Sequence, residues 1–150
     1  MSVTVRRAQA SDLDWLVSQL RVFAAQYGTA HSLFPEDPDH AQFVLSSLIE
    51  HHLFLVAERG SEPLGFVAGL FTTHPFNPSI RMLVEQFWWV SEEHRGTSAG
   101  ARLLDAFDRE GSKRADWIVF TLEHHSPVNE RALTHRGFRL QERAYLKEVG

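Results

Sequence analysis

Residues 90–104 read Val-Ser-Glu-Glu-His-Arg-Gly-Thr-Ser-Ala-Gly-Ala-Arg-Leu-Leu and connect an apolar strand to a helix through a turn of small residues. Small side chains from Gly96 to Ala101 let backbone N–H groups approach a bulky ligand, and the first turn of a helix carries a partial positive charge. The stretch therefore predicts a site for a phosphate or pyrophosphate. The alternative is an ordinary strand-to-helix connection in which Thr97 or Ser98 is the N-cap.

Two well-known nucleotide-binding motifs are absent. No Gly-Lys-Ser/Thr is present, which excludes a P-loop, and no Gly-x-Gly-x-x-Gly is present, which excludes the dinucleotide fingerprint. The remaining pattern, Arg-Gly-x-x-x-Gly-Ala after an apolar strand, resembles the coenzyme A cradle of the GNAT acetyltransferase superfamily, Gln/Arg-x-x-Gly-x-Gly/Ala. Arg95 and Gly100 match the ends of that motif, whereas Ser98 stands at its first glycine.

The hydrophobic periodicity of the rest of the chain predicts alternating blocks of strand and helix. Ser11, with Asp14 completing a capping-box-like pair, is expected to open a helix that ends at Gly28, and Pro38 is expected to begin a second helix. The other predicted elements are strands at 3–7, 53–58, 63–73, 81–90, 117–122 and 138–149, and helices at about 97–114 and 128–136.

This order, β-α-α-β-β-β-α-β-α-β, resembles the GNAT order over the whole chain. The resemblance implies one α/β (α+β) domain over residues 1–150, in which four helices flank a mixed, strongly bent central sheet of six to seven strands. Residues 64–69 look like the third strand of that fold, and Arg136-Gly137-Phe138 looks like the start of its last strand. Residues 85–90, followed by His94-Arg95-Gly96, look like GNAT acetyltransferases of bacteriophages and bacteria.

Composition excludes several other classes of function. The net charge is −4 and no stripe of Lys or Arg appears, which argues against a nucleic-acid partner. The apolar runs are strand-sized and no secretion signal begins the chain, so we expect no membrane partner and a cytoplasmic location. The chain has no cysteine, and its nine histidines include neither His-Glu-x-x-His nor helical ligand spacing, so we expect no metal site.

The resemblance implies that the cofactor is acetyl-CoA. Its pyrophosphate would lie on backbone N–H groups of Arg95, Gly96, Thr97, Ser98, Ala99, Gly100 and Ala101. Its pantetheine arm would pair like an extra strand with the edge at Trp88, Trp89 and Val90, and the Val90 N–H would polarise the thioester carbonyl. An Asn of the family that touches the cofactor corresponds to Ser126 by counting back from Gly137, or to Asn129 by residue type.

Glu85 is the candidate general base, because it interrupts an apolar strand where GNAT enzymes often carry a Glu that works through water. The alternative is a structural carboxylate at a sheet end. Strict alternation would place Glu85 on the face of Phe87 and Trp89, opposite Trp88 and Val90, unless a bulge intervenes.

The general acid is harder to assign. Family members commonly place a Tyr where this chain has Leu133, which cannot donate a proton. Tyr145, in the predicted last strand, is the substitute candidate, and its alternative role is a packed strand aromatic. Solvent could also protonate the leaving thiolate.

These features predict an N-acetyltransferase that acetylates a primary amine of a small molecule or protein by direct attack in a ternary complex. Homodimerisation is expected from the family. The rival prediction is a GNAT-fold module that binds coenzyme A or a protein partner with weak or no catalysis, and Ser98 and Leu133 are the residues that favour it.

Overall fold

The computed structural model describes residues 1–26, 37–123, 126 and 128–150, which form one five-stranded sheet and four α-helices. The strand order is β1-β2-β3-β4-β5, antiparallel throughout except that β5 runs parallel to β4. The strands are β1 (Val3–Arg7), β2 (Leu53–Arg59), β3 (Glu62–Thr73), β4 (Arg81–Val90) and β5 (Trp117–Val119). The helices are α1 (Leu13–Ala25), α2 (Pro38–His51), α3 (Ala99–Gly111) and α4 (Arg131–Thr134).

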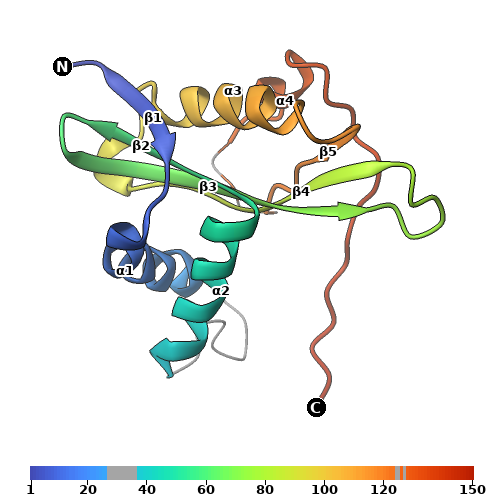
Figure 1. Ribbon diagram of the computed structural model, residues 1–150, viewed down its shortest axis with the longest axis horizontal. Helices are drawn as coiled ribbons and strands as arrows, with labels where there is room; N and C mark the ends of the chain where they lie inside the picture. The colour runs from blue at the N-terminus through green and yellow to red at the C-terminus, as the bar shows by residue number, and fades with distance from the viewer. Residues whose placement is uncertain (27–36, 124–125, 127) are drawn as a thin grey trace.

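The sheet separates two layers of helices (Figure 1). Helices α1 and α2 lie on one face, and α3 lies on the other. Each face has its own core of buried side chains, one that contains Leu16, Leu45 and Trp89 and one that contains Leu103 and Phe107. The residue patterns predict this arrangement, because strands buried on both faces read as nearly continuous apolar runs.

The first two helices follow their predicted periodicity, although the first begins differently from the prediction. A short 3-10 turn precedes α1, and Asp12 rather than Asp14 accepts a backbone hydrogen bond, from the Gln9 N–H at 2.8 Å. The Arg6 guanidinium holds the same carboxylate at 2.8 Å, which fixes it at this position. The predicted end of this helix at Gly28 lies outside the described residues.

Strand β4 carries a β-bulge at Gln86. Ala68 of β3 pairs with Phe87, but the next residue of β3, Gly69, pairs with Glu85, so Gln86 is the extra residue. The bulge reverses the alternation of side chains after it. Glu85 therefore lies on the α3 face together with Trp88, and strict alternation predicts the wrong face for it.

The sheet opens between β4 and β5. These strands pair only from Met82 to Val84 of β4 against Trp117 to Val119 of β5, so no strand among the described residues pairs with the second half of β4 on that side. We call this opening the β4–β5 split. Its existence agrees with the edge that the family resemblance implies for pantetheine.

Four predicted elements differ from the structure. The described sheet has five strands rather than six to seven, and β5 ends at Val119 rather than residue 122. The predicted last strand at 138–149 is not a strand in this chain, because residues 139–150 leave the sheet as an exposed extended segment (Figure 1). Helix α3 is shorter than predicted at both ends, and α4 is reduced to four residues. In the described residues, no helix combines the length and apolar character that a membrane span requires.

Candidate functional site

The predicted anion cradle is a turn followed by the N-terminal turn of α3. Gly96 has φ +91°, a left-handed conformation that favours glycine. The Thr97 Oγ1 donates to the His94 carbonyl at 2.7 Å and accepts from the Ala99 N–H at 3.3 Å. Ser98 is the N-cap with φ −77°, so the serine at the motif's first glycine position needs no positive φ.

The cradle leaves backbone donors unpaired. The first hydrogen bond within α3 runs from the Arg102 N–H to the Ser98 carbonyl at 3.0 Å. In the part of the chain that the structure describes, no acceptor pairs with the N–H groups of Gly96, Ser98, Gly100 and Ala101. Unpaired N–H groups at the start of a helix together form a site for an anion.

The cradle contacts the end of β4 through Gly100. An ideal Cβ built on Gly100 would lie 3.7 Å from Val90 Cγ2 and 3.9 Å from Trp88 Cζ2, which is ordinary van der Waals distance. The packing of the chain therefore does not require glycine there.

The Val90 N–H points into the β4–β5 split. The next residue, Ser91, donates its N–H to the Leu64 carbonyl of β3 at 2.9 Å. Because successive N–H groups along a strand point to opposite edges, the Val90 N–H is directed away from β3. The Val90 carbonyl on this side accepts from Arg95 Nε at 3.2 Å.

The two arginines of the cradle lie at its surface. The Arg95 guanidinium stacks over the Trp89 ring at 4.6 Å from its centroid, in addition to its bond with Val90. Arg102 Nε donates to the Ser98 hydroxyl at 3.1 Å. Arg102 therefore lies at the first turn of α3, whereas Arg95 lies along the edge of β4 with its guanidinium over the Trp89 ring.

The adjacent tryptophans face opposite layers. Trp89 is buried against α1 and α2, whereas Trp88 lies on the α3 face and packs edge-on against Phe120 at 5.1 Å. The Trp88 Nε1 is buried without a hydrogen-bond partner in the described chain. Trp88, rather than Trp89, thus lies on the side of the cradle.

Gln19 of α1 is a residue that sequence reasoning missed. Its Oε1 accepts from Trp89 Nε1 at 3.0 Å and from Ser91 Oγ at 2.9 Å, and both of those residues are buried. The side chain thereby ties α1 to the point where β4 enters the cradle. The sequence around Gln19 does not predict this role, because only the tertiary fold brings the Trp89 indole and the Ser91 hydroxyl to its side chain.

Glu85 lies where β4 and β5 separate. Its side chain is only 8 % exposed, and its Oε2 accepts from the Thr121 N–H at 3.2 Å. Burial raises the pKa of the Glu85 carboxyl to about 8, because the charged form loses hydration, and the hydrogen bond from Thr121 only partly offsets this. A carboxyl with this pKa can hold or release a proton near neutral pH.

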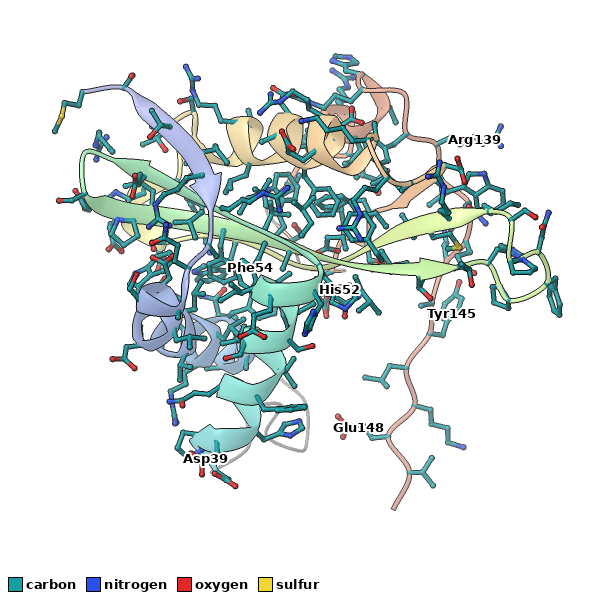
Figure 2. All side chains as sticks on the ribbon, in the orientation of Figure 1. Asp39, His52, Phe54, Arg139, Tyr145 and Glu148 are labelled. Atoms are coloured by element: carbon teal, nitrogen blue, oxygen red, sulfur yellow. The ribbon has the colours of Figure 1, made fainter. Side chains whose placement is uncertain are left out.

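The structure does not bring Tyr145 to Glu85. Tyr145 is 89 % exposed on the C-terminal segment (Figure 2), and Leu133 in α4 has no proton to donate. Tyr27, the only other tyrosine of the chain, lies outside the described residues.

The remaining candidates have local contacts near α4. Asn129 Oδ1 accepts from the Arg131 N–H at 2.9 Å, and Ser126 Oγ accepts from the Val128 N–H at 3.2 Å, so each oxygen supports its own loop. His124 and His125, which follow the predicted strand at 117–122 and are expected either to line an acceptor cleft or to be loop histidines, lie outside the described residues. Within the described residues, no group of three His, Cys, Asp or Glu side chains is arranged to hold a metal ion.

Comparison with known proteins agrees with this geometry. Residues 17–138 match the Acetyltransferase (GNAT) family. The chain belongs to this family. Its fold and mixed sheet are those of GNAT acetyltransferases, whose co-substrate is acetyl-CoA.

Solved GNAT structures superpose on nearly the whole chain. A ribosomal-protein-alanine N-acetyltransferase from Brucella melitensis biovar Abortus 2308 has a TM-score of 0.75 at 18% identity, covering 100% of this chain and 99% of that one. A predicted acetyltransferase with acetyl-CoA from Clostridium acetobutylicum has a TM-score of 0.73 at 15% identity, covering 99% and 96%. These identities support a shared fold alone. A search of curated proteins finds no sequence match.

Proposed function

We propose that this GNAT protein is a cytoplasmic, acetyl-CoA-dependent N-acetyltransferase that acetylates a primary amine by direct attack in a ternary complex. The observation that carries the proposal is the convergence of three features on the α3 side of the β4–β5 split. These are the unpaired N–H groups of the cradle, the Val90 N–H and the buried carboxyl of Glu85.

The cradle is the proposed binding site for the cofactor phosphates. The N–H groups of Gly96, Ser98, Gly100 and Ala101 would donate to phosphate oxygens, and Arg95 would add a charge-assisted hydrogen bond. Thr97 and Ala99, whose N–H groups are already paired, shape the turn instead. Trp88, Trp89 and Val90 would supply the strand edge for the pantetheine arm, and Ser126 or Asn129 a further polar contact.

The split is the proposed place of acyl transfer. When bound, acetyl-CoA would supply an acetyl group activated as a thioester. The Val90 N–H would donate to the acyl oxygen and stabilise the negative charge that develops there. Glu85, reached through a water molecule because of its burial, would take the proton that the attacking amine loses.

The proton for the leaving thiolate is assigned to Tyr145 or to solvent. Tyr145 would have to move from its exposed position to serve, whereas solvent can protonate a thiolate with a pKa of about 8.5 without any protein group. A Tyr145→Phe variant separates the two, since a solvent-only route predicts an unchanged rate.

Two measurements test the proposal. Calorimetry with acetyl-CoA should show binding at micromolar concentrations, and mass spectrometry of cell extract incubated with labelled acetyl-CoA should reveal an acetylated small molecule or protein amine. Absence of binding at tens of micromolar would contradict the cofactor assignment, and binding without any labelled product would contradict the enzymatic one.

Glu85→Gln tests the base. The kcat/KM of the wild-type protein should rise with pH through about 8, because only the ionised Glu85 accepts a proton. The variant should lose this rise and fall on the order of 100-fold in rate while keeping its affinity for acetyl-CoA. An unchanged pH profile would remove Glu85 from the mechanism. Glu123→Gln, at an exposed carboxylate after β5, is the matched control.

A GNAT module that binds coenzyme A or a protein partner without catalysis is the second candidate. It is favoured by one observation: Leu133 occupies the position of the family tyrosine, and Tyr145 is exposed. Hydrolysis of acetyl-CoA or acetylation of any amine in a broad panel would exclude this candidate.

A further inference from the structure

The turn that leads from β4 into the cradle, yellow in Figure 1, lies beside the start of β3. The Ser91 N–H donates to the Leu64 carbonyl of β3 at 2.9 Å. A Cβ built on Gly65 would lie 2.5 Å from the Trp89 carbonyl oxygen, so the two backbones are in close contact there. Beyond Ser91, no backbone hydrogen bond joins residues 92–98 to β3 in the described chain. The rest of the turn therefore depends on its side chains for a fixed position against the sheet.

The imidazole of His94 is the side chain of the turn that reaches β3. His94 Nε2 lies 2.9 Å from Oε1 of Glu62, the first residue of β3. Nε2 can donate to this oxygen when it carries a proton, and the two side chains form an ion pair when both ring nitrogens are protonated. The carboxylate of Glu93 is also near, but it lies 3.9 Å from Nε2. The His94 side chain is only 12% exposed, so Glu62 is the partner that holds it against β3.

The His94 carbonyl extends this attachment into the cradle. It accepts from the Thr97 N–H at 3.3 Å and from Thr97 Oγ1 at 2.7 Å. Thr97 Oγ1 accepts in turn from the N–H of Ala99, the first residue of α3, at 3.3 Å. Gly96 and Ser98, whose N–H groups have no acceptor among the described residues, lie between these contacts. The position of His94 therefore determines where the unpaired N–H groups of the turn are directed.

We propose that His94 is a positioning residue for the cofactor, and that its contact with Glu62 holds the cradle turn in the conformation that binds the phosphates of acetyl-CoA. This inference rests on the function proposed for the cradle. A turn that is loose in the free protein can bind the phosphates for only a fraction of the time, and the measured Kd rises by the inverse of that fraction. Loss of the contact should therefore weaken the binding of phosphate-bearing ligands and leave the strand edge for pantetheine unchanged.

Substitution of His94 tests this inference by calorimetry. His94→Ala should raise the Kd about 10-fold both for acetyl-CoA and for 3′-phospho-ADP, and it should leave the weak binding of pantetheine unchanged. His94→Gln keeps an amide N–H that can reach Glu62, so it should bind acetyl-CoA within about 3-fold of the wild-type Kd. Glu93→Gln is the matched control in the same turn, and it should bind as the wild type does. Wild-type affinity in His94→Ala, or no recovery in His94→Gln, would overturn the inference.

Substitution of the exposed Glu62 side chain provides an independent variant should His94→Ala fail to fold. Glu62→Ala should raise the Kd for acetyl-CoA by the same factor as His94→Ala, and the double variant should be no weaker than either single one. Fully additive effects of the two substitutions would overturn the inference, because they would show that His94 and Glu62 act on binding separately.

Hydrogen exchange of the free protein tests the turn without the cofactor. The amides of Arg95 and Thr97, which donate within the turn, should exchange at least about 10-fold faster in His94→Ala and Glu62→Ala, whereas the buried Leu103 of α3 should exchange as in the wild type. Equal exchange of the turn in both variants and the wild type would overturn the inference even where acetyl-CoA binds. A wild-type protein that does not bind acetyl-CoA would contradict the proposed function instead, and the exchange rates would then decide whether His94 orders the turn.

Discussion

Glu85 is buried at a point where two strands separate, and no cation pairs with it in the described chain. The Thr121 N–H donates a hydrogen bond to its carboxylate. With a pKa raised by burial to about 8, the carboxyl stays protonated in the folded protein at pH values where it is ionised in the unfolded chain. Glu85 therefore lowers the free energy of unfolding at neutral pH.

The raised pKa of Glu85 makes the free energy of unfolding depend on pH. Between about pH 5 and 8 the folded state binds one proton more than the unfolded state, so the free energy of unfolding falls by about 1.4 kcal/mol per pH unit from this group. The contribution of Glu85 to stability is fully present at acid pH, and it is lost as the pH rises through the pKa that Glu85 has in the folded protein. Glu85→Gln does not titrate, so its stability relative to wild type should increase by that amount per unit.

Urea unfolding at several pH values checks this prediction. Glu123→Gln, at an exposed carboxylate, is the control variant. A stability difference between Glu85→Gln and wild type that does not change from pH 5.5 to 7.5 would contradict the raised pKa.

Gln19 carries a second prediction at the residue scale. Gln19→Ala removes the shared acceptor of two buried donors, the Trp89 indole N–H and the Ser91 hydroxyl. The variant should lose about 1–3 kcal/mol of unfolding free energy, which is the cost of an unsatisfied buried polar group. Gln26→Ala, at an exposed residue after α1, should change stability by less than about 0.5 kcal/mol.

A double-mutant cycle gives the Gln19 prediction its sharper test. Trp89→Phe removes one of the orphaned donors, so the two substitutions together should cost less than the sum of their separate effects. Strict additivity would show that the hydrogen bond from Trp89 to Gln19 adds nothing to stability.

At the scale of elements, β4 shows what periodicity can and cannot predict. Its bounds follow from the sequence, because a run of apolar and aromatic residues between Arg81 and Val90 favours a strand. The bulge at Gln86 has no comparable signal, since neither glycine nor proline marks it. One inserted residue nevertheless decides that Glu85 shares a face with Trp88, and so decides the composition of the candidate site.

The C-terminal segment illustrates a different limit. Its alternating pattern predicts a strand at 138–149, but a strand exists only where a neighbouring strand pairs with it. Local sequence cannot identify that neighbour. The turn before α3, in contrast, follows from local sequence, because small residues before an amphipathic helix leave the first N–H groups of that helix unpaired. That these groups bind an anion stays a prediction.

Helix α3 carries a prediction that compares two of its glycines. At Gly100 a methyl group fits against Val90 and Trp88, so Gly100→Ala should keep or raise stability, by up to about 1 kcal/mol. The same methyl group would stand among the unpaired N–H groups and should weaken acetyl-CoA binding at least about 10-fold.

Gly111→Ala is the contrasting variant in the same helix. Its Cβ would lie 2.5 Å from Leu83 Cδ2, so it should destabilise the fold. Because Gly111 lies at the other end of α3 from the cradle, Gly111→Ala should leave the affinity of the folded protein for acetyl-CoA unchanged. Calorimetry and thermal unfolding measure both properties, and normal cofactor affinity in Gly100→Ala would show that no ligand approaches this glycine closely.

At the scale of the whole molecule, the cradle and the split should respond to different parts of the cofactor. A ligand that binds only the folded chain stabilises it by about 2.7 kcal/mol at a concentration of 100 times its Kd. For a chain of 150 residues this corresponds to a rise in Tm of roughly 5–10 °C.

If the N–H groups of the cradle hold the pyrophosphate, 3′-phospho-ADP should produce much of this rise, whereas pantetheine, which lacks pyrophosphate, should produce little at the same concentration. Gly100→Ala should reduce the rise with acetyl-CoA without lowering the Tm of the free protein. A rise with pantetheine equal to that with acetyl-CoA would instead place the binding energy in the split, along β4, and leave the cradle as a strand-to-helix connection.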